Sequence, residues 1–131
     1  MQYRQFGSTG VKISRLGFGA MRLPQKSVSG KMVTDHEEGA RILRRAFELG
    51  VNYVDSAPYY CDSESEVVVG KALKGWREKV YVSTKYPVGD GSYREQLEKS
   101  LKRLDTGWID FYHFWGIDWE TFETKINIQN G

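Results

Sequence analysis

Cysteine, long apolar runs and an excess of charge of one sign are scarce or missing in this sequence. Cys61 is the single cysteine of the 131 residues, so no disulfide can form within the chain. Because disulfides are rare in reducing compartments, we expect a cytoplasmic protein. No apolar run approaches the roughly 18 residues of a membrane-spanning helix, and no apolar segment follows residues 1–4 as in a signal peptide. These absences predict a protein with no membrane partner.

The charged residues are balanced and interspersed. The chain has 19 basic and 17 acidic side chains, a formal net charge of +2, and lacks the basic stripe that nucleic-acid-binding proteins use. Apolar residues make up 40% and charged residues 27%, which is typical of a globular domain with its own core. We therefore interpret residues 1–131 as one domain, and expect neither a nucleic acid partner nor a bound metal.

A strand followed by a helix is the unit that repeats along the chain. Residues 50–55, 80–85 and 109–114 are short and rich in β-branched or aromatic side chains, which predicts strands. They begin near positions 51, 80 and 109, which is 29 residues apart both times. An earlier strand is predicted within residues 15–21. Strict alternation of strand and helix predicts parallel strands joined by right-handed crossovers.

Helices are predicted between these strands from their start signals, their apolar faces and the glycines that follow them. Three pairs have the spacing of a capping box, Thr34 with Glu37, Ser63 with Glu66, and Ser92 with Glu95. Two apolar faces are expected, one formed by Ile42, Ala46 and Leu49 and the other by Leu97, Leu101 and Leu104. The glycines at the expected helix ends are Gly50, Gly75 and Gly107.

Two architectures are compatible with this repeat. One is a small open, doubly wound sheet that 131 residues can complete, and the other is a (β/α)8 barrel, which needs about 250 residues. The spacing of the strands does not separate them. Residues 1–14 read as a β-hairpin, with strands at 3–6 and 11–14 around a Gly-Ser-Thr-Gly turn. A hairpin before the first parallel strand is not expected of the minimal open sheet.

Polar side chains stand at the carboxyl ends of the predicted strands. Side chains at every second position of a strand share one face of the sheet. On each of three predicted strands, the polar member of that face stands near the carboxyl end, and these members are Asp55, Lys85 and His113. Parallel α/β folds bind ligands at that end of the sheet. Tyr59 and Tyr60 follow Asp55 closely, so an acid, a lysine, a histidine and a tyrosine are expected to converge.

This combination of residues suggests proton transfer. A free tyrosine has a pKa of about 10 and is a poor proton donor near neutral pH. A nearby lysine cation stabilises the phenolate and lowers that pKa, and a carboxylate paired with the lysine holds it charged and in place. A tyrosine tuned in this way could protonate a carbonyl oxygen while hydride arrives from a cofactor.

Four motifs in order resemble those of the aldo/keto reductase family. Asp55–Tyr60 (DSAPYY) is similar to the family's D-x-A-x-x-Y, and Ser65–Leu73 (SEVVVGKAL) to its S-E-x-x-x-G-x-A-L. Val82–Lys85 (VSTK) resembles the lysine motif of its third strand. The opening, residues 6–10 and 16–22, resembles its hairpin and first strand. The resemblance extends from Tyr3 to Asp118.

The resemblance implies a fold and an activity. The fold would be the N-terminal half of a (β/α)8 barrel, with the hairpin at residues 1–14 followed by about four β/α units and truncated in the tail after residue 118. The activity would be NADP(H)-dependent reduction of an aldehyde or ketone, NAD(H) being the other possible cofactor. Most groups that hold the cofactor in this family come from the second half of the barrel.

The resemblance also implies roles for individual residues. Tyr60 would be the general acid, Lys85 would tune its pKa, and Asp55 would pair with Lys85. Three further residues would lie near the nicotinamide together with Asp55, namely Gly19, Ala20 and Met21.

The fourth strand departs from the family's pattern D-x-Y-x-x-H. Trp115 occupies the position of the histidine, and His113 lies two residues earlier on the same face, about 6.6 Å deeper. Either His113 takes the histidine's role from a lower place in the barrel, or it is structural and Trp115 lines the site. Tyr59 and Trp115 are interpreted as lining of the substrate pocket.

Two other functions remain open at this point. The chain could be a non-catalytic half-barrel that assembles with itself or with a complementing chain, or a small open-sheet binding domain. The second of these lacks a phosphate-binding loop after its first strand. The stretch from Asp110 to Gly116 is also similar to reductases whose barrel is followed by a ferredoxin-like iron–sulfur tail, although one cysteine cannot ligate a cluster.

Overall fold

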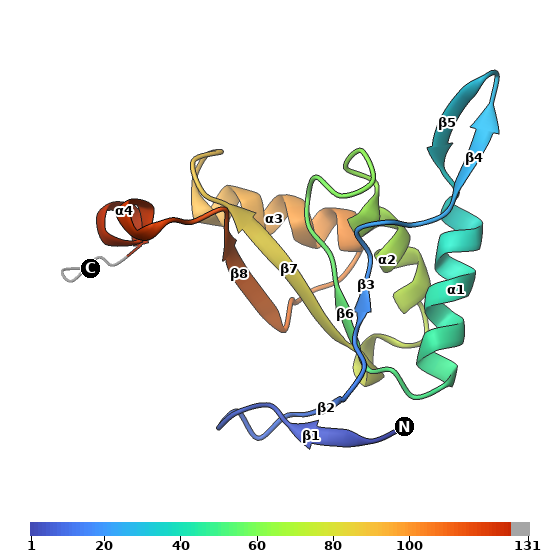
Figure 1. Cartoon of the computed structure of the whole chain (residues 1–131), viewed down its shortest axis with the longest axis horizontal. Helices are drawn as coiled ribbons and strands as arrows, with labels where there is room; N and C mark the ends of the chain where they lie inside the picture. The colour runs from blue at the N-terminus through green and yellow to red at the C-terminus, as the bar shows by residue number, and fades with distance from the viewer. Residues whose placement is uncertain (127–131) are drawn as a thin grey trace.

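A four-stranded parallel sheet forms the centre of the molecule in the computed structural model, which describes residues 1–126. Its strands lie in the order β3, β6, β7, β8 (Figure 1). Their bounds are Phe18–Gly19 for β3, Tyr53–Asp55 for β6, Tyr81–Pro87 for β7 and Phe111–Trp115 for β8. The four strands predicted from the sequence are therefore confirmed, with β3 much shorter than residues 15–21. The tail expected after residue 118 lies partly outside the described residues.

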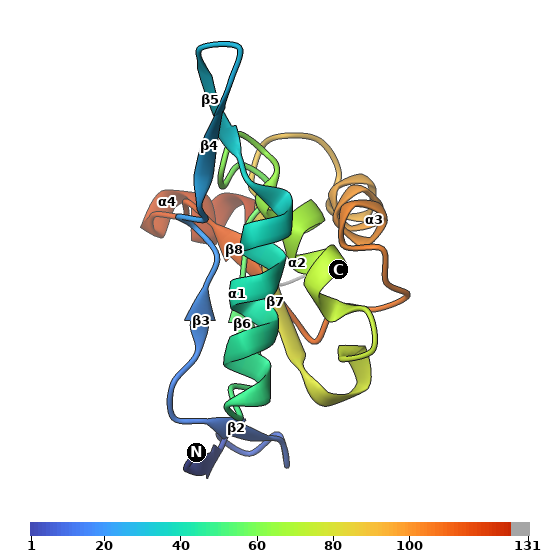
Figure 2. The same cartoon turned by 90° about the vertical axis from the view of Figure 1, so that its right-hand side faces the viewer.

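The helices follow the strands in the order that the repeat predicts. Three long helices, together on one face of the sheet (Figure 2), are α1 at His36–Glu48, α2 at Ser65–Leu73 and α3 at Tyr93–Leu104. Three short helical segments are a 3₁₀ turn at Arg77–Lys79, α4 at Trp119–Thr121 and a π turn at Phe122–Ile126. This layering, a parallel sheet covered by helices on its outer face, is one side of an α/β barrel.

Two hairpins precede the first long helix. The predicted one is confirmed, with β1 at Tyr3–Gln5 antiparallel to β2 at Lys12–Ser14. The second, β4 at Gln25–Val28 and β5 at Lys31–Thr34, projects away from the sheet and was not predicted (Figure 1). Its two-residue turn places Ser29 and Gly30 at φ 51° and 78°. Positive φ at both central residues matches the right-handed twist of the flanking strands, which is why a Ser-Gly pair can close it.

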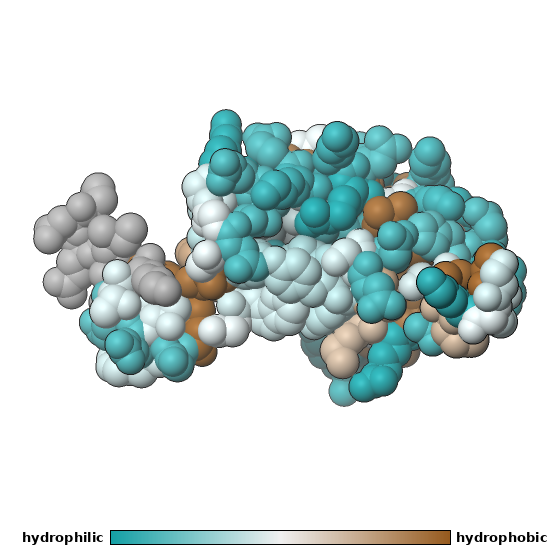
Figure 3. All heavy atoms as spheres, turned by 90° about the horizontal axis from the view of Figure 1, so that it is seen from above, coloured by the Kyte–Doolittle hydropathy of each residue, from teal (hydrophilic) through white to brown (hydrophobic). Residues whose placement is uncertain are grey.

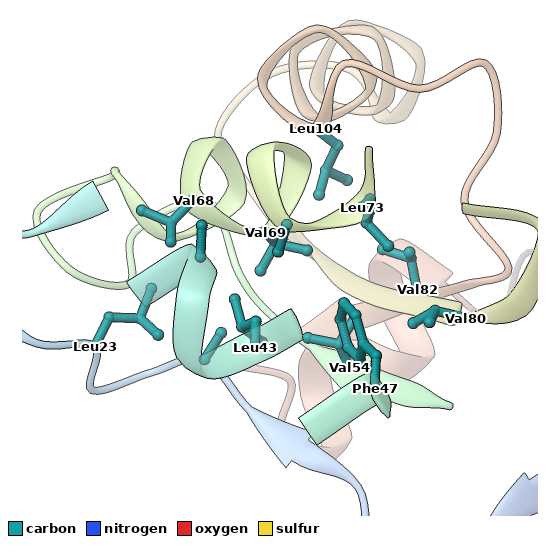
Figure 4. Close-up of a cluster of buried hydrophobic side chains, with 13 residues drawn as sticks. Leu23, Leu43, Phe47, Val54, Val68, Val69, Leu73, Val80, Val82 and Leu104 are labelled. Atoms are coloured by element: carbon teal, nitrogen blue, oxygen red, sulfur yellow. The ribbon is translucent and has the colours of Figure 1, made fainter. Parts of the chain in front are cut away.

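The core lies between the sheet and the helices (Figure 4). Its side chains come from all three long helices, from β6 and β7, and from the segments just before β4 and β7. The ten large ones are Leu23, Leu43, Phe47, Val54, Val68, Val69, Leu73, Val80, Val82 and Leu104. The face predicted for α1 was wrong, because Leu49 is exposed and Ile42 and Ala46 are only half-buried. The buried face is instead Gly39, Ala40, Leu43 and Phe47.

Gly39 explains why α1 turns this face inward. A Cβ at this position would lie 2.8 Å from the Cγ1 of Val68, which is closer than real Cβ atoms come. The glycine therefore lets α1 and α2 approach each other more closely than any side chain would allow. An apolar pattern in the sequence does not register glycine as a core residue, so the predicted face was rotated.

Only one of the three predicted capping boxes is present. Ser92 and Glu95 form both reciprocal hydrogen bonds at the start of α3, as predicted. Asp35, not Thr34, caps α1 by accepting the Glu38 N–H. Within residues 1–126, no side chain caps α2.

Ser63 and Glu66 do not form the capping box predicted for α2. Ser63 adopts a left-handed conformation with φ 69°, and Glu66 is only 1% exposed. Glu66 accepts hydrogen bonds from Thr84 Oγ1 at 2.6 Å and from Arg103 Nε at 2.5 Å, so a buried carboxylate joins α2, β7 and α3. At the end of α3, Asp105 takes the left-handed position with φ 51°, so Gly107 was wrongly predicted as the terminating glycine.

The outer strands β3 and β8 each have one neighbour among the described residues. Much of the surface seen from above is hydrophilic, with a hydrophobic group beside the C-terminal segment (Figure 3). Exposed large side chains in the C-terminal part of the chain include Phe114, Ile117 and Trp119. Among residues 1–126, no helix is both long and apolar enough to cross a membrane.

Candidate active site

The face of the sheet opposite the helices divides into an apolar end and a polar end. At the amino ends of the strands, Phe111 packs edge-on against Phe6 with ring centroids 4.8 Å apart, and contacts Tyr53 at 5.7 Å and Tyr81 at 6.3 Å. Phe6 comes from the β1–β2 hairpin, so the hairpin closes this end with an aromatic cluster. The polar groups lie two to four residues further along each strand.

Asp55 and Lys85 form an ion pair at the carboxyl ends of β6 and β7. Lys85 Nζ lies 2.7 Å from Asp55 Oδ2 and donates a second hydrogen bond to the Ser56 carbonyl at 2.6 Å. Ser83 Oγ donates to the other carboxylate oxygen of Asp55 at 2.7 Å. The Lys85 side chain is 15% exposed and that of Asp55 is 34% exposed, so the pair is held on several sides but still reaches solvent.

Tyr60 lies over this pair. The Lys85 Nζ atom is 4.8 Å from the centroid of the Tyr60 ring, and Trp115 packs edge-on against the same ring at 5.8 Å. Among the described residues, none forms a hydrogen bond with the Tyr60 hydroxyl. The three residues after Tyr60, at positions 61–63, all have positive φ, between 54° and 69°. This left-handed turn reverses the chain and leads it into α2.

Tyr59 has a different environment from its neighbour. Its hydroxyl donates to Asp90 in the loop after β7, and its ring lies 5.8 Å from that of Trp115. The hydrogen bond to the Asp90 carboxylate, with a smaller contribution from burial, raises the pKa of Tyr59. Its proton is therefore held by Asp90, whereas the Tyr60 hydroxyl makes no hydrogen bond among the described residues.

Trp115, and not His113, contacts the tyrosines. His113 pairs in register with Lys85 on the adjacent strand, but it is exposed, and its side chain makes no hydrogen bond or ion pair within residues 1–126. Trp115 is half-buried and touches both Tyr59 and Tyr60. The structure thus brings together Asp55, Lys85, Tyr60 and Trp115, and places His113 beside them without a partner.

The end of β3 forms the neighbouring wall. Ala20 is fully buried and its N–H donates to the Asp55 carbonyl at 2.8 Å, while Met21 is 49% exposed. Gly19 is exposed, and a Cβ at this position would meet nothing within 4 Å. Gly19 and Met21 therefore leave an open surface next to the Asp55–Lys85 pair.

Two polar groups around the site were not found from the sequence. Ser56 and Ser65 are fully buried and share a hydrogen bond at 2.7 Å. Ser65 was assigned only to a motif, and its spacing from Ser56 carries no signal of contact.

Asp110 is a structural residue. Its carboxylate accepts from Arg77 at 2.8 Å and from the Val82 N–H at 2.8 Å, so it fastens the start of β8 to β7.

The structure thus combines a half-barrel of parallel strands with a carboxylate, a lysine and a tyrosine at the strand ends. The sequence model described as "Aldo/keto reductase family" matches residues 15–126. The chain belongs to the aldo/keto reductase family. The fold predicted from the sequence, the N-terminal half of a (β/α)8 barrel preceded by a β-hairpin, is confirmed by its structural neighbours.

Three relatives show the extent of the similarity. L-galactose dehydrogenase from Arabidopsis thaliana is 32% identical over 137 residues, which cover 97% of this chain and 42% of that protein. The holo form of an aldo-keto reductase from Bacillus halodurans is 35% identical with a TM-score of 0.72, over 87% of this chain and 40% of the other. An aldo-keto reductase from Klebsiella pneumoniae in complex with NADPH is 25% identical with a TM-score of 0.67, over 79% of this chain and 35% of that one. The chain thus spans about two fifths of the length of these relatives.

Proposed function

We propose that this chain carries the proton-donating half of the active site of an NADP(H)-dependent reductase of aldehydes or ketones. The observation that carries the proposal is the stack of Tyr60 over the Asp55–Lys85 pair, with 2.7 Å between the charged groups and 4.8 Å from Lys85 Nζ to the ring centroid. NADPH bound to the Klebsiella pneumoniae relative supports this choice of cofactor, and NAD(H) is the alternative.

Tyr60 would donate the proton that a carbonyl oxygen needs on reduction. When the phenolic proton leaves, negative charge develops on the tyrosine oxygen, and the Lys85 cation beside the ring stabilises that charge. Asp55 would orient Lys85, because the ammonium donates two hydrogen bonds, one to the Asp55 carboxylate and one to the Ser56 carbonyl. The half-buried position of Lys85 strengthens these interactions relative to water.

The nicotinamide would lie against Gly19 and Met21, with Asp55 at its edge. When bound, the cofactor supplies hydride to the carbonyl carbon. The chain's own contribution is to hold the Tyr60 hydroxyl, which has no hydrogen bond among residues 1–126, where a carbonyl oxygen can reach it. Tyr59 and Trp115 would form the apolar wall of the substrate pocket.

Trp115 would replace the histidine that the family has at this position. An indole N–H can orient a carbonyl oxygen but cannot exchange a proton near neutral pH. Proton transfer would then depend on Tyr60 alone. If His113 has no catalytic role, His113→Ala leaves the kinetics of the folded protein unaltered, whereas a loss of kcat would give the histidine role to His113.

Titration of the 131-residue chain with NADPH, followed by cofactor fluorescence, is the first test. Saturable binding supports the proposal, and the same preparation can then be assayed with aldehydes and ketones. A folded chain that does not bind NADPH would reject a cofactor site formed by this chain by itself, and would leave assembly with a complementing chain as the question.

Variants of the two adjacent tyrosines test the acid. In a full-length protein with the complete barrel, Tyr60→Phe should lower kcat by about 100-fold or more, the contribution typical of a general acid, while NADPH binding persists. Tyr59→Phe retains the ring against Trp115 and should lose far less. Lys85→Met should remove most of the turnover and shift the pH profile of the activity that remains. An unchanged kcat in Tyr60→Phe would reject the assignment.

A second candidate function, assembly with another copy or a complementing chain, is favoured by the two outer strands. Among the described residues, β3 and β8 each leave one edge without a partner, and such edges pair readily with other strands. Sedimentation analysis of the 131-residue chain, with and without NADPH, distinguishes a monomer from an assembly and shows whether binding depends on assembly.

A further inference from the structure

We propose that Ser56 and Ser65 are positioning residues. Their hydroxyl pair holds the segment after β6, which accepts a hydrogen bond from Lys85, in place against the end of β3, and this inference rests on the reductase function proposed above. The pair links the strand that carries Asp55 to the end of β3. Neither serine would touch the substrate. Each would act through a backbone carbonyl, Ser56 through its own and Ser65 through that of Ala20.

The direction of the hydrogen bonds follows from counting protons. Ser65 Oγ lies 2.7 Å from the Ala20 carbonyl, which can only accept, so Ser65 donates its single proton there. The 2.7 Å contact between the two hydroxyls must then have Ser56 as its donor. The result is one chain of bonds from the Ser56 hydroxyl through Ser65 to the Ala20 carbonyl.

The same segment holds the reactive lysine. The Ser56 carbonyl accepts from Lys85 Nζ at 2.6 Å, and the Ser56 N–H donates to the Ser83 carbonyl at 2.9 Å. The Ala20 N–H in turn donates to the Asp55 carbonyl at 2.8 Å. A displacement of Ser56 would therefore move one of the two acceptors of the Lys85 ammonium, and a displacement of Ala20 would move the wall assigned to the nicotinamide.

Burial makes this chain of bonds difficult to replace. Ser56, Ser65 and Ala20 are all 0% exposed, so water cannot take over a lost partner. Ser65 is the first residue of α2, a position where serine often serves the helix start. Within residues 1–126, however, α2 has no side-chain cap, and the Ser65 hydroxyl is bonded to the site instead.

The variant Ser65→Ala, made in the 131-residue chain, tests the proposal without requiring turnover. The first readout is the rate at which the Lys85 amine is acylated by acetic anhydride, measured by mass spectrometry against pH. Only the neutral amine reacts, so weakening one acceptor of the ammonium should raise the rate about threefold to tenfold. The second readout is hydrogen exchange of the peptide 18–24, which should accelerate locally.

Ser100→Ala is the matched control. Ser100 is another buried serine, 1% exposed, whose hydroxyl accepts from Arg103 at 3.3 Å on α3. The Ser100→Ala variant should lose stability as Ser65→Ala does, but should not change the acylation rate of Lys85 or the hydrogen exchange of residues 18–24. Ser56→Ala should reproduce the effect of Ser65→Ala, and the double variant should add little, because both remove the same chain of bonds.

The outcomes separate this inference from the reductase proposal. Unchanged Lys85 labelling in a folded Ser65→Ala or Ser56→Ala variant would overturn the positioning role, and so would an equal change in Ser100→Ala. NADPH titration of the unmodified chain tests the proposed function by itself. Altered labelling in a chain that binds no NADPH would leave the serine pair as a support of Lys85 and reject the reductase proposal.

Discussion

Replacement of Arg103 by methionine should reveal how strongly the buried carboxylate of Glu66 binds three elements of the fold together. Glu66 is 1% exposed, and its two partners are Thr84 at 2.6 Å and Arg103 at 2.5 Å. Arg103→Met keeps an apolar chain of similar length but removes the cation. The carboxylate is then left in the interior with one neutral hydrogen bond.

The expected loss of stability is about 3 kcal/mol. Breaking a buried ion pair by removing one partner typically costs about 3 to 5 kcal/mol, because the remaining charge is desolvated without compensation. The lower end applies here, since the Arg103 side chain is 27% exposed and Thr84 still donates to Glu66. A domain of this size is stable by about 5 to 15 kcal/mol, so the loss is a large fraction of the total.

Urea unfolding followed by circular dichroism measures this difference. A loss of 3 kcal/mol should lower the midpoint by about 2 M, given a slope of about 1.5 kcal/mol per molar for a small domain. Arg94→Met is the control, because Arg94 lies on the same helix and pairs with Glu98 at an exposed site, which should cost less than about 0.5 kcal/mol. The double variant Glu66→Gln/Arg103→Met removes the charge and should recover most of the loss. Equal midpoints for Arg103→Met and Arg94→Met would refute the reasoning.

Three further predictions concern helix starts and a buried hydroxyl. Ser92→Ala should destabilise the fold by about 1 kcal/mol because it removes the cap of α3, whereas Ser63→Ala should change the stability by less than about 0.5 kcal/mol. Equal losses of the two variants in urea unfolding would reject the role of Ser92 as a cap. The hydrogen bond from Glu38 N–H, and then Lys26, holds the pKa of Asp35 below its ordinary value of 3.8. The contribution of Asp35 to the free energy of unfolding is therefore present above pH 3.8 and is lost as the pH falls through the lowered pKa. Asp35→Asn should remove this pH dependence of stability from acid unfolding curves. Burial raises the pKa of Tyr112 to about 12, and its hydroxyl has no hydrogen-bond partner among the described residues, so Tyr112→Phe should be neutral or stabilising by up to about 1 kcal/mol. A thermal melt that shows clear destabilisation would contradict this.

Much of the fold follows from local patterns. Short β-branched and aromatic runs at a constant spacing predicted the parallel strands, because strand formation and side-chain alternation depend on residues close in sequence. The same alternation placed Asp55 and Lys85 on one face, and the register of β6 and β7 then brought them to 2.7 Å. The cap formed by Ser92 and Glu95 is equally local, since its partners are three residues apart.

The features that were mispredicted depend on residues distant in sequence. Ser63 and Glu66 have the spacing of a capping box, yet Glu66 turns inward to bind Arg103, which lies 37 residues away. The burial of Gly39 depends on Val68, a contact between two helices. In both cases a local preference worth about 1 kcal/mol was overridden by packing or by a buried charge that required a partner.

The sequence by itself therefore determined the class of fold, the family and the residues Asp55, Tyr60 and Lys85 as candidates, because these depend on local pattern and motif. Only the tertiary structure gave the two adjacent tyrosines different surroundings, by bonding the Tyr59 hydroxyl to Asp90 31 residues away. It also placed Trp115 against both tyrosines and joined Ser65 to Ala20 across 45 residues. Such contacts form when whole elements pack, and no local window of sequence records which of them will meet.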